Sequence, residues 1–456
     1  VYTYMPQILQ IFLFTIIFMF ALLVVYFRRL YGVLIPMLGI AVSSIWGIGI
    51  LSLLGYNLDP LTMVIPFLIS ARAMSHGIQL VERYYDEFGK CGSGQKAARI
   101  TFDSLFRPGS LGVISDAVGL LLISLGSIPI NTKLSYYASI WALCVILNVL
   151  ILVPTLLSVL PQPKSGEIRH GWVRKFLPKI GTLVSSRKGA LNILALTAVC
   201  FVIGGYYSTS VQIGEAEPGS PLLYPNHDYN VSSSAINKSF PGSEELYIIA
   251  RTEEKGGLKK PEVIKSLEDF QSYMLDDPDL GGAKGLPDLV KQVNRLLHNN
   301  DPRFIQVPHD ENYVGGLMFA YMASSPVPGA LKEFVNPEET DANMVFYYKD
   351  HQGETIRRAV HMVKSWIDEK GNDIEGLSFH LAGGIIGVTA AINEAVFETN
   401  RIVVPAVLVL IFLFVTFFYS SLHAGWMMFL AMSFATILSY GYMGFMNMGI
   451  NVNTVP

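Results

Sequence analysis

A stripe of four polar side chains runs along a stretch of sequence that is otherwise apolar enough to cross a membrane. Its members are spaced i, i+3, i+4 and i+7, which places them on one face of a helix: Arg72, Ser75, His76 and Gln79. A carboxylate, Asp116, follows in the next apolar segment. Because an isolated charge near the bilayer centre costs roughly 3 kcal/mol or more, such residues usually pair, and they often mark ion or proton pathways.

The depth of these residues in the bilayer predicts which of them meet. Counting 1.5 Å per residue from the cytoplasmic helix ends puts Asp116 about 12 Å deep, between His76 at about 9 Å and Arg72 at about 15 Å. The functional interpretation is that Asp116 takes up and releases a proton, Arg72 favours its charged form, and His76 relays the proton, with Ser75 as a further member of the proton relay. The alternative is a static ion pair that orients two helices.

Composition limits the class of protein. Half of the residues are hydrophobic (51%), 15% are charged, and the apolar residues gather in blocks of about 18 or more, the length that crosses a hydrocarbon core. The net charge of −3 gives no reason to expect a nucleic-acid partner. Cys91, Cys144 and Cys200 show no CxxC or metal-ligand spacing, so the sequence implies neither a disulfide framework nor a zinc site. No cofactor is expected.

The apolar blocks predict about eight membrane spans. Their ranges are 6–27, 33–54, 61–81, 109–128, 137–160, 190–208, 402–420 and 424–446. Residues 210–398, between the sixth and seventh spans, are numerous enough to form a separate domain.

Basic residues predict the orientation of these spans. Lysine and arginine are concentrated in the loops after the first, third and fifth spans, which the positive-inside rule assigns to the cytoplasm: Arg28, Arg29, Arg83, Lys90, Lys96, Arg99, Arg107, Lys164, Arg169, Arg174, Lys175, Lys179, Arg187 and Lys188. The alternate loops, "GYNLDP" and "GSIPINTKLS", carry only Lys133 and are expected outside. By parity, residues 210–398 also lie outside.

The region 210–398 shows strand patterns that alternate with helical ones. Aromatic and β-branched residues predict strands over 244–252, 342–350 and 376–384. Amphipathic patterns predict helices over 260–275, 286–297 and 353–371. This alternation favours a small α/β sandwich with split βαβ topology. A last helix, 385–400, is predicted to continue directly into the seventh span.

The chain also resembles itself. Residues 46–60 and 440–454 place Gly47 over Gly441, Gly55 over Gly449 and Asn57 over Asn451 at a constant offset. Duplication of a helical bundle explains this, and duplicated halves build the sites of many transporters. Complete copies would need further spans beyond both ends of the chain. Chance similarity between glycine-rich helix ends is the alternative.

Several motifs together resemble the RND superfamily, in the branch of predicted exporters that includes the MmpL lipid transporters and the hopanoid transporters, and more remotely Patched-like proteins. They are "GYNLDPLTMVIPFLI", "HGIQLVERYYDE", "RPGSLGVISDAVGLLLISLGSIPI", "LVPTLLSVLPQP", "PGSPLLYPNHDYN" and "YSSLHAGWMMFLAMSFATILSYGYMGFMNMGINVN". They cover most of the chain.

This resemblance implies an internally duplicated α-helical membrane bundle with an α/β porter-like periplasmic domain. The implied parts are 1–160 (spans two to six), 161–189 (cytoplasmic linker), 190–209 (span seven), 210–398 (periplasmic domain) and 399–456 (spans eight and nine). It further implies proton-driven alternating access that exports lipids or other hydrophobic molecules from a bacterial inner membrane. Family members work as monomers, dimers or trimers, and periplasmic or outer-membrane proteins are expected partners.

One departure from the family bears on the mechanism. Family members usually carry the proton-carrying aspartate at the position of Ser75, whereas Asp116 falls where the neighbouring span commonly has serine or threonine. The carboxylate has then moved one helix over, or coupling rests with a residue beyond Pro456, or this branch does not use protons.

Two other functions compete with transport. A sterol-sensing or lipid-binding membrane protein that does not pump would keep the bundle without needing Asp116. A membrane enzyme is not expected, because HExxH, GxSxG and Walker motifs are absent from the sequence.

Overall fold

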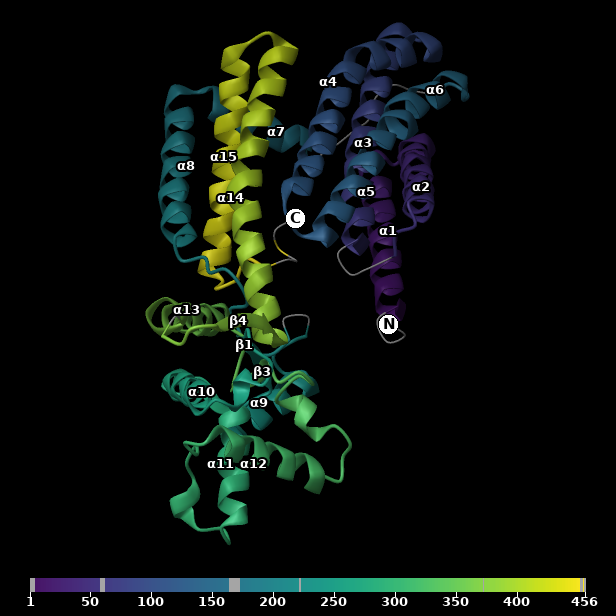
Figure 1. Ribbon diagram of the computed structural model, residues 1–456. Helices are drawn as coiled ribbons and strands as arrows, with labels where there is room; N and C mark the ends of the chain where they lie inside the picture. The colour runs from purple at the N-terminus through teal and green to yellow at the C-terminus, as the bar shows by residue number, and fades with distance from the viewer. Residues whose placement is uncertain are drawn as a thin grey trace. The chain divides into compact units, whose positions relative to one another are not determined.

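The computed structural model divides the chain into two compact units. It describes residues 5–57, 62–163, 173–220, 223–371, 373–451 and 454. One unit, here called the helical unit, comprises Val1–Thr209 and Glu398–Tyr442; the other, the α/β unit, comprises Ser210–Phe397 and Met443–Val455. Figure 1 labels the elements of both units.

The helical unit confirms that this is a membrane protein. Its helices are α1 (Met5–Phe27), α2 (Leu30–Leu53), α3 (Ile65–Cys91), α4 (Gly94–Leu122), α5 (Pro129–Val145), α6 (Leu152–Val159), α7 (Val173–Ser185), α8 (Arg187–Ser208), the later part of α14 (Gly384–Tyr419) and most of α15 (Leu422–Phe445). A π-helix over Ile146–Ile151 joins α5 to α6. Within the described residues, seven helical stretches are long and apolar enough to span a bilayer, and Leu13–Phe27 is a shorter apolar helix.

Two helices extend well beyond the predicted spans. Helix α3 continues to Cys91, and α4 already begins at Gly94 and passes through Pro108 without ending. The turn between them is short because Gly92 adopts a left-handed conformation (φ 66°), which stops α3. A two-residue connection makes α3 and α4 neighbours in space, as their extensive contacts confirm.

Close packing of α2 on α5 depends on a glycine. The indole of Trp141 is fully buried against Gly47, and a Cβ built at Gly47 would lie 2.1 Å from a ring carbon. The indole N–H also donates a hydrogen bond to the hydroxyl of Ser43 (3.0 Å). Any side chain at position 47 would therefore push the two helices apart.

We expect Gly47→Ala to lower the free energy of unfolding by about 1–3 kcal/mol, because the added methyl overpacks the contact with Trp141. The measurement is the thermal unfolding midpoint of the purified protein in detergent. Gly49→Ala is the matched control, since a Cβ there meets nothing within 4 Å. Alanine favours the helix, so the control should be neutral or slightly stabilising. Equal effects from both substitutions would contradict the packing argument.

The similar segments 46–60 and 440–454 lie at the ends of α2 and α15, and these two helices end at different aligned positions. Gly441 packs closely on Gly204 of α8, whereas Gly47 packs on Trp141. Helix α15 ends at Phe445, which corresponds to Leu51 under the constant offset, two residues before the end of α2 at Leu53. Both glycines thus permit a close helix contact, but with different partners. Internal duplication remains a prediction.

The α/β unit contains a four-stranded sheet. The strands are β1 (Glu244–Thr252), β2 (Leu280–Lys284), β3 (Asp341–Tyr348) and β4 (Leu377–Gly383), in the order β2-β3-β1-β4, and every neighbouring pair is antiparallel. The segment from β1 through a helix to β2 interlocks with the segment from β3 through a helix to β4. This is the predicted split βαβ topology.

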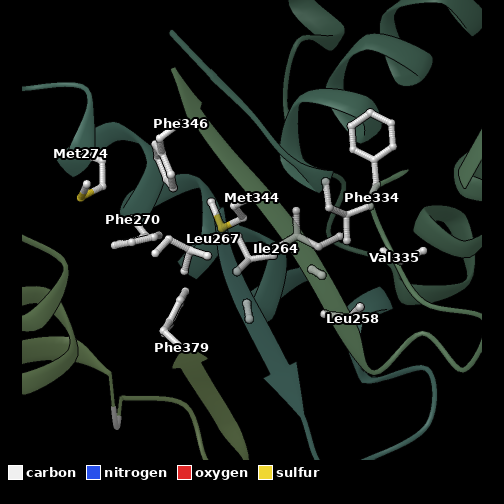
Figure 2. Close-up of a cluster of buried hydrophobic side chains, with 14 of the residues drawn as sticks. Leu258, Ile264, Leu267, Phe270, Met274, Phe334, Val335, Met344, Phe346 and Phe379 are labelled. Atoms are coloured by element: carbon white, nitrogen blue, oxygen red, sulfur yellow. The ribbon is translucent and has the colours of Figure 1, made fainter. Parts of the chain in front are cut away.

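One face of the sheet carries the core of the α/β unit. Leu246, Ile248 and Ala250 alternate along β1 and are fully buried, as expected for a strand with one covered face. Helices α10 (Pro261–Met274) and α13 (Gly353–Lys370) contact each other, and both supply residues to this core. Figure 2 shows Phe270 of α10 between Phe346 of β3 and Phe379 of β4. Helices α9 (Asp228–Ser239), α11 (Leu286–Leu297) and α12 (Glu311–Ser324) also belong to this unit, as does α14 up to Phe397.

The segment after α15 returns to the α/β unit. The Gly214 amide donates to the carbonyl of Ile450 (2.9 Å), and the Asn451 side-chain amide donates to the carboxylate of Glu215 (3.0 Å). Beside this junction, contact with the Glu244 carboxylate, 3.3 Å from Nδ1, raises the pKa of His351 above its ordinary value of 6.5, although burial opposes the shift. The junction therefore combines backbone pairing with charged contacts.

Candidate functional site

The structure pairs Arg72 with Asp116 across two apolar helices. Nε of Arg72 lies 2.6 Å from Oδ2 of Asp116, and the two side chains are 44% and 38% exposed within the protein. Arg72 comes from the N-terminal third of α3 and Asp116 from the C-terminal third of α4. The predicted ion pair is therefore present, on a face of the helical unit that the described protein residues leave partly open.

The packing of α3 places the polar stripe that begins at Arg72 on that open face. Ala73, Gly77 and Leu80 are buried, and Gly77 lies so close to Pro36 of α2 that a Cβ there would be 3.2 Å from the proline ring. These residues anchor one side of α3. The polar residues on the other side therefore cannot turn into the core without breaking this contact.

A glycine on α4 leaves room for the arginine. A Cβ at Gly112 would lie 3.5 Å from Nη2 of Arg72, so a longer side chain there would compete with the guanidinium for space. Gly112 precedes Asp116 by four residues and therefore lies one turn away on the same face of α4. The local sequence thus supplies both the carboxylate and the space for its partner.

The other predicted members of the site do not join the ion pair. Ser75 is exposed and accepts a long contact from the side-chain amide of Gln79 (3.5 Å). His76 is half-buried, and its Nε2 has no hydrogen-bond partner among the described residues. Depth alone predicts that His76 and Asp116 meet, but the described part of the chain shows no hydrogen bond or ion pair between them. The proton-relay role of His76 and Ser75 remains a prediction.

Buried polar groups elsewhere in the bundle were missed by the sequence analysis. Asn148 lies in the π-helix, is 3% exposed, and its Nδ2 has no partner within the described residues. The hydroxyl of Tyr26 donates to Glu82 (2.9 Å) and so ties α1 to α3. The signal for Asn148 was a single amide within the apolar run "CVILNVLILVP". A π-helical turn frequently accompanies a functional position.

An apolar pocket of about 330 Å³ lies between α1, α2 and α3. Met19, Met37, Ile40 and Phe67 are among the residues that line it. Polar groups are few, and the hydroxyls of Ser44 and Ser70 approach to 3.4 Å at its wall. Its volume and apolar lining suit a small hydrophobic ligand or part of a lipid.

The described residues contain no cluster of three or more histidine, cysteine, aspartate or glutamate side chains suited to a metal ion. Cys91, Cys144 and Cys200 are free thiols. The function is argued below from the ion pair between Arg72 and Asp116 and from the apolar pocket between α1, α2 and α3.

Comparison with known proteins gives no further constraint. No family model matches the chain, and no curated protein matches it. The likeness to RND exporters accordingly rests on the sequence motifs described above, and the function is argued from the geometry of the site.

Proposed function

We propose that this chain belongs to a secondary transporter of the RND type, which uses the proton gradient to move lipids or other amphiphilic molecules out of the membrane. The ion pair between Arg72 and Asp116 carries this proposal. Protonation of Asp116 would neutralise its charge and leave Arg72 without its partner, so the contact between α3 and α4 has two electrostatic states. Such a pair can convert proton uptake into a change of helix packing.

The proposal includes the side of the membrane on which the α/β unit lies. The distribution of lysine and arginine favours a cytoplasmic position for the connection between α3 and α4, and parity then puts the α/β unit on the opposite side. In a bacterial inner membrane, that side is the periplasm. An α/β unit placed there could receive cargo that leaves the membrane and pass it to a periplasmic or outer-membrane partner. The action proposed is transport rather than an enzymatic reaction.

The apolar pocket between α1, α2 and α3 supports a second candidate function. A membrane protein that binds a lipid or sterol without pumping would need such a cavity, and it would not need a titrating carboxylate. In that case Arg72 and Asp116 would form a static pair that holds α3 against α4.

A transport assay with the full-length protein in lipid vesicles separates these candidates. Fluorescent phospholipid is placed in the protein-containing vesicles, and its transfer to acceptor vesicles is followed with and without an imposed pH gradient. We expect transfer to depend on the gradient and to fall to the rate of protein-free vesicles when a protonophore collapses it. Transfer that is unchanged by the protonophore would reject proton coupling. Lipid binding without transfer would favour the second candidate.

A further inference from the structure

A groove of about 380 Å³ lies in the α/β unit between α13 and the beginning of α14. Its volume falls in the range typical of ligand sites. Small residues of α14, namely Gly387, Ala390 and Ala391, form one wall and leave the space open. Val360 of α13 and Phe397 of α14, the latter half-exposed, give the groove further apolar surface.

Two cations stand on the α13 side of this groove. Arg357 and Lys364 are exposed, and each is one turn of helix from Val360, so the three follow one stripe about 10 Å long. Neither cation makes an ion pair or hydrogen bond with the described residues, whereas the adjacent Arg358 is held by Asp277 and Asp279. Glu394 is the one acidic residue among those that line the groove, so the two cations leave the groove with a net positive charge.

We infer that this groove binds one lipid molecule with an anionic head group. Arg357 and Lys364 would hold the head group, and an acyl chain would lie along Ala390 and Ala391 toward Phe397. Unpaired cations next to an apolar channel match an anionic amphiphile, because the anionic head group would contact the cations and the acyl chain would contact the apolar wall. A wholly polar ligand would leave the apolar wall in contact with water.

The course of α14 supports a lipid rather than a soluble anion. The helix continues without interruption from the groove into its membrane-spanning part. Only about 8 Å of helix separates Phe397 from Ile402, where the apolar run begins. The groove therefore lies within a few turns, along the same helix, of residues apolar enough to enter a bilayer. The inference that this lipid is cargo rests on the proposed transport function; its binding in the groove does not.

Photo-crosslinking tests the binding site directly. The full-length protein in neutral detergent is incubated with phosphatidylglycerol that carries a photoactivatable acyl chain, and the labelled peptides are mapped. We expect label on residues 387–397, with competition by unlabelled phosphatidylglycerol and weaker competition by phosphatidylcholine. Label restricted to the membrane spans, or equal competition by both lipids, would overturn the inference.

Variants show whether the head group is recognised. Replacing both cations, Arg357→Gln with Lys364→Gln, should weaken phosphatidylglycerol binding about tenfold, because two exposed charged contacts of modest strength are lost together. Lys255→Gln with Lys265→Gln is the control, because both lysines are exposed residues of the α/β unit that do not line the groove. Equal binding by the two double variants would overturn the inference.

A second substitution tests the apolar wall. Ala391→Phe should fill the groove and remove the label, whereas Val388→Phe, at an exposed position of α14 outside the groove, should not. Thermal unfolding of each variant shows that the fold is kept. Because these measurements need no proton gradient, failure of lipid binding and failure of coupled transport are distinguishable. Label that persists in Ala391→Phe would contradict the proposed path of the acyl chain.

Discussion

Replacing Asp116 by asparagine should reduce lipid-dependent proton uptake to the level of vesicles without protein. Asparagine has nearly the same shape as aspartate but cannot bind and release a proton near neutral pH. Its amide also removes the charge that Arg72 contacts at 2.6 Å, so the pair would lose its two-state character. The measurement is the fall in pH inside vesicles that contain the full-length protein and a membrane-lipid extract, reported by an enclosed pH-sensitive dye.

Two variants make this result specific. Asp103→Asn changes an exposed aspartate on the same helix that pairs loosely with Arg99 (3.9 Å), and it should leave proton uptake unchanged. Asp116→Glu keeps a carboxylate and should retain part of the activity. If Asp116→Asn takes up protons at the wild-type rate, at matched expression, the role of Arg72 and Asp116 is purely structural.

Replacing Phe270 by alanine should destabilise the α/β unit by about 3–5 kcal/mol. The Phe270 ring is fully buried and lies beside Phe346 and Phe379 (Figure 2). Its centroid is 5.1 Å from that of Phe379 and 5.5 Å from those of Phe346 and Trp366. Truncation would remove the ring contacts and leave a cavity at the centre of the core. Loss of this free energy corresponds to an increase of about a hundredfold or more in the population of the open state.

Hydrogen exchange measures this effect within one unit of a large protein. Amides of β1 that exchange only through global opening of the α/β unit should exchange faster in Phe270→Ala by the same factor. Phe319→Ala is the matched control, because this phenylalanine on α12 is 64% exposed and should contribute little. Unchanged protection of β1 in Phe270→Ala would show that the aromatic cluster does not hold the sheet.

Regular patterns in the sequence predicted much of the fold. The amphipathic stretch 286–297 coincides with α11, and the three strongest strand patterns became β1, β3 and β4. The strand β2 was missed because its sequence, "LGGAK", is rich in glycine, which strands generally disfavour. Its glycine is nevertheless required, because a Cβ at Gly281 would lie 1.9 Å from the carbonyl oxygen of Pro241. Such close approaches arise from tertiary structure and leave no local signal.

The candidate site was predictable in part. Depth along two helices was enough to pair Arg72 with Asp116, since both charges need a partner within the bilayer. Depth does not fix the direction in which each side chain points from its helix. His76 and Asp116 therefore lie at similar depths without a hydrogen bond or ion pair between them in the described part of the chain. The groove between α13 and α14 was not predictable, because it exists only where Arg357 and Lys364 come to lie beside small residues of another helix.

The continuity of α14 has a mechanical consequence. An uninterrupted α-helix resists bending and twisting, because both motions strain its backbone hydrogen bonds, and α14 has no loop where the α/β unit gives way to the helical unit. Pro405 lies further along and lacks the N–H that would bond to the carbonyl of Arg401. Bending of α14 should therefore concentrate near Pro405, inside the apolar stretch, and the turns of α14 before that residue should stay straight.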